Sequence, residues 1–351
     1  MKLHLPALDP EAAGRSRVRD AQLTKPPGSL GLLESLPPLF AGLQGNDIPT
    51  ARPAALFLFG ADHPATKHGI SPYPSAVTQA MMGNFVRGGA AAAVLAEHHR
   101  IPLTVVDVGV DGSPDFHSTR SGLTFVQSPH RRRPAGDIRH EDAQTPDDFG
   151  CSVEYARSLV LGAEGPLHLT LLGEMGIGNT TVAAAVGASL LGLDDPGQLV
   201  GRGTGADDAM LEAKRAVVRD ACRRVSGEKD PLELLRRLGG RELASLAGAM
   251  LGALERGSAV LVDGFIVTTV ALAVVRAFPA ARSRLLFAHS GDEHGHRALL
   301  AALDARPLLA LGLRLGEGSG ALLAFALVEQ ALALHGRMAT FAEAAVPDRE
   351  R

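Results

Sequence analysis

Short apolar runs alternate with longer, helix-prone segments along most of the chain. The short runs are continuously apolar, which is typical of strands that are buried on both faces of a sheet. They lie at residues 54–59, 103–108, 167–172, 259–262 and 284–288. The longer segments have the length and composition of helices, and they lie at residues 80–98, 180–191, 207–225 and 242–255. Repeated strand–helix units predict an α/β fold with a Rossmann-like, mostly parallel sheet and helices on both faces.

Two parts of the chain fall outside this alternation. Residues 1–50 are rich in proline and predict short helical pieces, for example at residues 30–34. Residues 111–150 contain several prolines and the arginine run at 131–133, and they show little apolar periodicity. Because isolated blocks of like charge are usually hydrated, we expect a solvated loop there.

Composition narrows the possible functions. The 35 Lys and Arg residues nearly balance the 38 Asp and Glu residues, for a net charge of −3, so the basic excess of a nucleic-acid binder is missing. The most apolar stretch, 259–275, is interrupted at Asp263 and Gly264, which predicts a buried strand and helix rather than a membrane span. Cys151 and Cys222 cannot build a disulfide framework, so we expect a reducing, cytoplasmic setting.

A glycine-rich segment, GEMGIGNTT at residues 173–181, directly follows the predicted strand 167–172. A glycine turn that opens a helix offers backbone N–H groups and a positive dipole end to an anion. The spacing is neither that of the dinucleotide-binding fingerprint nor that of the P-loop. Phosphate binding and a plain strand-to-helix turn capped by Asn or Thr both remain open.

Two further glycine clusters carry charged residues. In the first, GRGTG at residues 201–205, Arg202 or the downstream Lys214 could neutralise a phosphate, or Lys214 could be a solvated residue of a capped helix. In the second, LGEGSGA at residues 315–321, Glu317 is flanked by glycine within an apolar stretch. Desolvation would raise the pKa of Glu317 and suit it to general-base work, but Glu317 could instead complement a helix dipole.

The segment 289–296 contains three histidines and two acidic residues. This composition invites a metal site, but the spacing fits no familiar zinc pattern. A loop at a strand end that is hydrogen-bonded to a partner or substrate is the other interpretation.

Taken in chain order, seven segments resemble the nicotinate-nucleotide–dimethylbenzimidazole phosphoribosyltransferase family, and together they stretch over about nine tenths of the chain. The three most specific are GEMGIGNTT, LRLGEGSGA at residues 313–321 and LTKPPGSLGLL at residues 23–33. The others are RGGAAA at 87–92, GRGTGADD at 201–208, LAGAMLG at 246–252 and DGFIV at 263–267.

The resemblance implies both an architecture and a reaction. Residues 51–324 would form a large α/β domain, residues 1–50 with 325–351 a small helical domain, and two chains a homodimer. The family transfers the phosphoribosyl group of nicotinate mononucleotide to 5,6-dimethylbenzimidazole with inversion, giving α-ribazole 5′-phosphate and nicotinate. No metal or other cofactor is implied, and neither a nucleic acid nor a membrane is an expected partner.

The resemblance also assigns roles to residues. Glu317 occupies the position of the general base, and Glu174 is a second carboxylate at the site. The implied nucleotide and phosphate contacts are Gly176, Ile177, Gly178, Asn179, Arg202, Gly203, Lys214, Asp263 and Gly264. The implied benzimidazole contacts are Ser71, Gln79, Met175 and Leu315.

This chain departs from the family pattern at two places near the substrate. Pro64 follows His63 where relatives have glycine, and Ser290 and Gly291 replace an Arg–Ser pair. A different benzimidazole, a purine or a phenol could therefore be the acceptor. Two other functions stay open: a metal-dependent hydrolase that uses the 289–296 cluster, and a catalytically silent nucleotide-binding protein.

Overall fold

The structure, a computed structural model, describes residues 2–112, 116–118, 120–131, 135–203 and 205–347. A sheet of six parallel strands lies at its centre, in the spatial order β3-β2-β1-β4-β5-β6. This is the strand order of doubly wound, Rossmann-type sheets, and it confirms the predicted fold class. The strands are β1 (Ala54–Ala61), β2 (Leu103–Gly109), β3 (Leu123–Gln127), β4 (Leu169–Met175), β5 (Ala259–Val262) and β6 (Leu285–Phe287).

Both faces of the sheet are buried under helices, as the continuous apolar runs predict. In β1, Phe57 and Phe59 belong to one core cluster while Leu56 and Leu58 belong to the other, because successive side chains point to opposite faces. The first cluster lies under α5 (Pro146–Leu161), α6 (Asn179–Leu191), α8 (Pro231–Leu238), α9 (Arg241–Glu255) and α10 (Phe265–Ala277). The second lies under α2 (Leu36–Gln44), α3 (Ala76–Arg87), α4 (Ala91–His99) and α12 (Ser319–Arg337).

The remaining elements are short or peripheral. Helix α7 (Asp208–Arg224) packs outside α6, and α11 (His296–Ala302) packs on α10. The 3-10 helices are η1 (Gly31–Ser35), η2 (Pro64–His68), η3 (Pro196–Leu199) and η4 (Pro279–Arg284). Pro64 occupies the first position of η2, where a missing N–H group costs little.

Two expectations about local structure were wrong. The segment 80–98 is two helices rather than one, because Gly88 has a left-handed backbone (φ 80°) and ends α3. The region 111–150 is also not simply a solvated loop, since it contains β3 and the start of α5. Arg131 is buried in it and forms a 2.9 Å ion pair with Asp107, whereas Arg132 and Arg133 lie outside the described residues.

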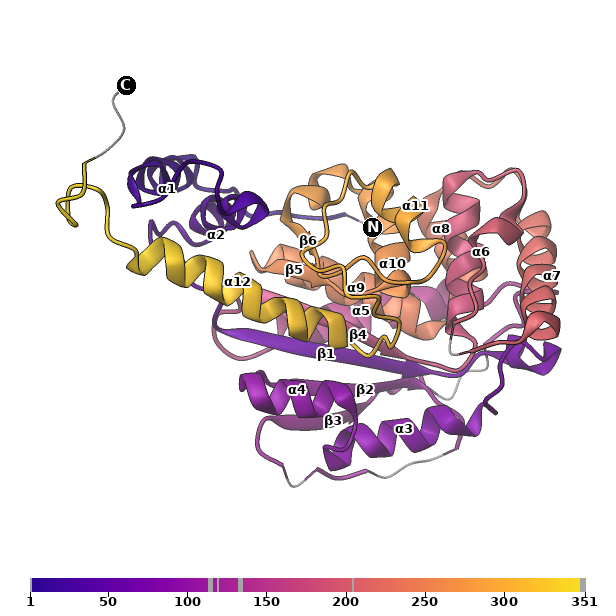
Figure 1. Cartoon of the computed structure of the whole chain (residues 1–351). Helices are drawn as coiled ribbons and strands as arrows, with labels where there is room; N and C mark the ends of the chain where they lie inside the picture. The colour runs from indigo at the N-terminus through magenta and orange to yellow at the C-terminus, as the bar shows by residue number, and fades with distance from the viewer. Residues whose placement is uncertain (1, 113–115, 119, 132–134, 204, 348–351) are drawn as a thin grey trace.

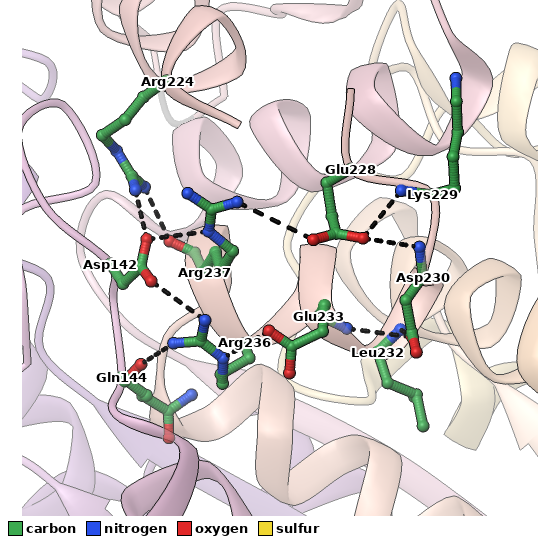
Figure 2. A network of polar contacts seen from close by, with 10 residues as sticks. All are labelled: Asp142, Gln144, Arg224, Glu228, Lys229, Asp230, Leu232, Glu233, Arg236 and Arg237. Atoms are coloured by element: carbon green, nitrogen blue, oxygen red, sulfur yellow. Dashed lines mark hydrogen bonds and ion pairs between the residues drawn. The ribbon is translucent and has the colours of Figure 1, made fainter. Parts of the chain in front are cut away.

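An arginine network holds the second half of that region against α7 and α8 (Figure 2). The carboxylate of Asp142 pairs with Arg224, with Arg236 at 3.0 Å and with Arg237 at 3.1 Å. Arg236 also donates to the backbone oxygen of Gln144 at 2.7 Å. The segment around Asp142, which has the composition of a charged loop, is thereby fixed against α7 and α8.

The N-terminal helices and the C-terminal segment meet at the outer end of α12 (Figure 1). Helix α1 (Pro10–Gln22) packs on α2, and Ser16 of α1 lies 3.2 Å from the ring of His335 in α12. A β-bridge between Leu23 and Thr340 ties the ends together. These contacts agree with a helical unit built from both ends, although the domain boundaries remain a prediction. Helix α12 has the length and hydropathy of a membrane span, but its apolar residues pack on the sheet.

Candidate active site

A cavity opens beyond the carboxyl ends of β4, β5 and β6. In open α/β sheets, this edge is where ligands bind. Predicted site residues that line it are Glu174, Met175, Gly176, Ile177, Asn179, Gly203, Gly264, Leu315 and Glu317. The cavity therefore brings together residues from four segments that are far apart in the sequence.

The turn that carries Glu317 has an unusual backbone. Glu317 itself has a left-handed conformation (φ 65°), and so do its neighbours Gly316 and Gly318. A Cβ atom on Gly173, in β4, would lie 2.5 Å from the backbone oxygen of Glu317, so the turn sits directly on the strand because Gly173 has no side chain. Such strain in a non-glycine residue persists only where the surroundings impose it, and it is frequent at functional sites.

Asp263, directly after β5, fixes this turn. Its carboxylate accepts hydrogen bonds from the backbone N–H groups of Gly318 (3.1 Å) and Ala321 (2.8 Å), at the start of α12. Burial raises the pKa of Asp263 to about 7, against the opposing effect of these backbone donors. The resemblance assigned Asp263 to the nucleotide, whereas its hydrogen bonds are made to the Glu317 turn. Its direct contact with a nucleotide stays a prediction.

Glu317 and Glu174 line the cavity from two different segments of the chain, and both are almost fully buried. Burial raises the pKa of Glu317, while the N–H group of Ala92, 3.4 Å from its carboxylate, opposes that rise. Burial also raises the pKa of Glu174 to about 8, and nearby carboxylates, Asp263 and Glu317 among them, add to the rise. The amide of Asn179 donates to Glu174.

We refer to Glu174, Asp263 and Glu317 as the carboxylate cluster. Raised pKa values in a cavity mark a candidate functional site. A cationic ligand would stabilise the ionised forms, and a carboxylate with a raised pKa is well matched to accept a proton near neutral pH. The cluster is thus suited to a ligand that carries or develops positive charge.

A second group of residues, the basic cradle, lies beside the cluster and consists of Thr180, Gly203, Lys214 and Arg314. The ammonium of Lys214 is buried and donates to Thr180 Oγ1 (3.1 Å) and to the backbone oxygen of Gly201 (2.9 Å). Arg314 lies 3.3 Å from the backbone oxygen of Gly203 and lines the cavity. The N-terminus of α6 opens onto the same space, so charge and helix dipole together favour an anion here.

Lys214 and Arg202 were both candidates for neutralising a phosphate, and the structure separates them. Burial lowers the pKa of Lys214, and the side chain points into the cradle. Arg202 instead donates to Asp208 (2.5 Å) and to the backbone oxygen of Ala206 (2.9 Å) and is solvent-exposed.

Six predicted residues lie outside the cavity lining: Arg202, Lys214 and Asp263, described above, and Gly178, Ser71 and Gln79. Gly178 is the left-handed residue (φ 94°) that precedes α6. Ser71 accepts from the backbone N–H of Tyr73, and Gln79 lies on α3 with its amide beside Gly112. The roles of Ser71 and Gln79 in binding the acceptor base stay predictions.

The histidine cluster does not form a set of free metal ligands. The backbone N–H of Gly291 donates to His296 Nδ1 at 2.9 Å, and His296 Nε2 lies 2.9 Å from the hydroxyl of Thr268. Burial lowers the pKa of His296 to about 3, so its ring is neutral. Because both ring nitrogens are engaged, His296 cannot contribute a ligand, which weakens the metal-dependent hydrolase hypothesis. Among the described residues, a group with metal-compatible spacing occurs at His68, Asp137 and His140, away from the cavity.

Sequence reasoning missed several residues at the site. Glu293 and Arg314 line the cavity, and neither was singled out. His63 was noted only for the proline after it, yet its Nε2 lies 2.5 Å from Glu242 in a fully buried pair beside Gly176. Arg314 lies within the LRLGEGSGA motif, so its charge next to that glycine turn was the available signal.

The strand order and the cavity, with its carboxylates beside a basic cradle, define an α/β enzyme that binds a phosphorylated ligand. The family model described as phosphoribosyltransferase matches residues 5–346. A Pseudomonas putida protein named nicotinate-nucleotide–dimethylbenzimidazole phosphoribosyltransferase is 48% identical over 97% of this chain and 96% of its own length. A Pseudomonas aeruginosa protein of the same name is also 48% identical, with the same coverage.

Solved structures agree with these matches. The crystal structure of the nicotinate-nucleotide–dimethylbenzimidazole phosphoribosyltransferase of Thermus thermophilus has a TM-score of 0.87 at 38% identity, and covers 97% of this chain and 100% of its own. This chain belongs to the nicotinate-nucleotide–dimethylbenzimidazole phosphoribosyltransferase family.

Proposed function

We propose that this chain transfers the phosphoribosyl group of nicotinate mononucleotide to 5,6-dimethylbenzimidazole or a related base. The transfer inverts the anomeric carbon and gives α-ribazole 5′-phosphate and nicotinate. The observation that carries the proposal is the buried, strained Glu317 in a cavity that also holds Glu174 and the basic cradle. Family membership supports the same reaction.

The leaving group needs little help from the protein. The pyridinium nitrogen of the nucleotide takes the electron pair of the breaking C–N bond and departs as a neutral ring, so no general acid is required. The attacking ring nitrogen of the azole becomes cationic as its bond to the ribose forms. Glu317 takes the proton from the other ring nitrogen, which restores a neutral azole. A base with a raised pKa is suited to this step.

Glu174 acts on the charge that passes through the ribose. As the C–N bond breaks, positive charge spreads over the anomeric carbon and ring oxygen, as in glycoside cleavage. A fixed, desolvated carboxylate nearby stabilises this charge more in the transition state than in the ground state. The hydrogen bond from Asn179 holds the Glu174 side chain in place.

The 5′-phosphate binds the basic cradle. Lys214 supplies the charge, and N–H donors come from the backbone at Gly176 and Gly178, before α6, and at Gly203, in the loop before α7. Ile177 has a different part, because its N–H donates to Thr78 at 3.1 Å and so fixes the loop rather than the ligand.

The acceptor base occupies the apolar side of the cavity. Met175 and Leu315 line that side, and Leu315 is 57% exposed, so the rim presents an apolar surface to an incoming flat ring. The identity of the acceptor base stays a prediction: of the departures from the family pattern, Gly291 lines this cavity, whereas Pro64 lines a different one. A homodimer and a cytoplasmic location remain predictions, and no cofactor is part of the proposed reaction.

A chromatographic assay tests the proposal. The purified protein is incubated with nicotinate mononucleotide and, separately, with 5,6-dimethylbenzimidazole, benzimidazole, adenine and p-cresol, with chelator present throughout. Release of nicotinate matched by an α-riboside phosphate is the expected result. Nucleotide binding without release would favour a silent binding protein, and activity that chelator abolishes would favour the metal-dependent hydrolase.

A further inference from the structure

The basic cradle already contains an anion, the carboxylate of Glu293. Burial raises the pKa of this carboxylate, while the positive charges of Lys214 and Arg314 and the backbone of Gly203 oppose that rise. Glu293 Oε1 lies 3.8 Å from the point where Gly203 would carry a Cβ atom, and Lys214 Nζ lies 3.1 Å from the same point. The carboxylate and the ammonium therefore share one small space.

The groups around the Glu293 carboxylate are the ones that a phosphate would use. A backbone N–H group, a lysine ammonium and an arginine guanidinium are typical phosphate donors. On its far side, the Glu293 carboxylate closes on Gly201, whose lack of a side chain leaves it room. Glu293 thus stands in the cradle as an internal counter-ion.

We propose that Glu293 sets the affinity of the nucleotide site, because its carboxylate competes with the 5′-phosphate for the basic cradle. This inference rests on the proposed function, in which that phosphate binds the cradle. A phosphate that entered beside the carboxylate would meet a like charge at short range, so binding requires the carboxylate to leave. The competition lowers the affinity for substrate and phosphorylated product alike, and it favours release of the product.

The surroundings of Glu293 provide a place for the displaced side chain. Its backbone is fixed by the N–H of Asp292, which donates to the backbone oxygen of Leu313, and by the N–H of His296, which donates to the backbone oxygen of Glu293 at 3.0 Å. The Glu293 side chain lines a second cavity as well, which Arg202 and Arg215 also line. Rotation of the side chain within this second cavity would carry the carboxylate away from Lys214.

Titration calorimetry with two ligands tests the proposal. Nicotinate mononucleotide carries the phosphate, and nicotinate riboside lacks it but is otherwise the same. Glu293→Gln keeps the size of the side chain and removes its charge, so it should bind the mononucleotide about tenfold or more tightly than the unmodified protein. Affinity for the riboside should change less than about twofold. The matched control is Asp292→Asn, the exposed neighbour, which should leave both affinities within about twofold.

Several outcomes would overturn the inference. An unchanged or weaker affinity of Glu293→Gln for the mononucleotide would show that the carboxylate does not compete. Weaker binding of both ligands would make Glu293 a contact to the ribose or the pyridine ring. Glu293→Ala is the second variant if the glutamine variant does not fold, and it should also tighten mononucleotide binding.

Failure of the proposed function would look different from failure of this inference. In that case the unmodified, folded protein would neither bind nicotinate mononucleotide nor release nicotinate. Binding and turnover by the unmodified protein, together with no gain in Glu293→Gln, would reject the competition alone.

Discussion

The two walls of the cavity are opposite in charge, and both are desolvated. The carboxylate cluster places Glu174, Asp263 and Glu317 close together, and burial raises the pKa of all three. The basic cradle places Lys214 and Arg314 beside the backbone of Gly203, and the carboxylate of Glu293 lies near the same glycine. A nucleotide with a cationic pyridinium at one end and a phosphate at the other matches this arrangement.

The two walls also balance their charges in different ways. In the cradle, the carboxylate of Glu293 offsets part of the positive charge of Lys214 and Arg314 before a phosphate enters. In the cluster the carboxylates face one another, and the cost of ionising them is left for the ligand's positive charge to offset. The cluster is therefore specialised for charge that appears during the reaction, and the cradle for charge that the substrate brings with it.

The largest expected effect follows from removing the base of the cluster. Glu317→Gln keeps the shape of the side chain but cannot accept a proton, so turnover should fall by about 10²-fold or more with nucleotide affinity nearly intact. Steady-state kinetics and calorimetry on the same preparation measure both quantities. An unchanged rate would remove Glu317 as the base.

The pH dependence gives the same residue a second test. A base must be ionised, and burial raises the pKa of Glu317, so the rate should fall as the pH drops through that raised pKa. Rates measured between about pH 5 and about pH 10 should show this acid limb. Any residual activity of Glu317→Gln should lack the part of the limb that belongs to Glu317.

Glu174→Gln should have a smaller effect on the rate. Loss of a fixed charge beside the anomeric carbon should lower kcat by about tenfold to 10²-fold, and KM for the nucleotide should change much less. A rise in KM with kcat unchanged would contradict this role, since it would mean that Glu174 contributes to binding alone. Glu233→Gln, on the solvent side of α8, is a carboxylate control that should leave kcat unchanged.

Glu174 should also govern how stability depends on pH. Its pKa rises from 4.5 to about 8 on folding, so the folded protein binds a proton that the unfolded chain has released between these values. The stabilisation is complete below about pH 4.5 and is lost as the pH rises through about 8, by a few kcal/mol. Chemical denaturation across this range should show the decline, and Glu174→Gln should flatten it. A decline of equal slope in the variant would assign it to Asp263 or other groups.

In the cradle, Lys214→Ala should act mainly on binding. Removing a charge-assisted hydrogen bond should raise KM for the nucleotide by about tenfold or more, and kcat should change less. Arg223→Ala, further along α7, is the matched control, because that exposed side chain pairs with Asp220 on the same helix. A defect limited to kcat would place Lys214 outside the phosphate site.

Much of this arrangement could be predicted from the sequence, because its signals are local. Continuous apolar runs indicated most of the parallel strands, and glycines on both sides of Glu317 marked a carboxylate in a tight turn. Strand β3 was missed because it is a short, half-buried edge strand. Glu293 could not be assigned because its partners Gly203 and Lys214 lie far away in the chain and only folding brings them together.

Arg202 and Lys214 illustrate the same limit at the cradle itself. Each is a cation near the same glycine cluster, and local spacing gives no reason to prefer one of them. The direction of α7 decides between them, because it carries Lys214 under Thr180 and leaves Arg202 on the surface beside Asp208. The tertiary structure, and not the residue type, decides which of these two cations is the proposed phosphate contact.

The smallest expected effect tests this selection directly. Arg202→Ala removes an exposed ion pair, and such pairs contribute about 0–1 kcal/mol, so KM for the nucleotide and the free energy of unfolding should change little. The ratio of the two KM changes, Lys214→Ala against Arg202→Ala, should be about fivefold or more when both are measured at one ionic strength. Equal effects would mean that Arg202 turns inward when the nucleotide binds. In that case the cradle would be assembled by its ligand, and the contrast between the two walls would hold only for the bound protein.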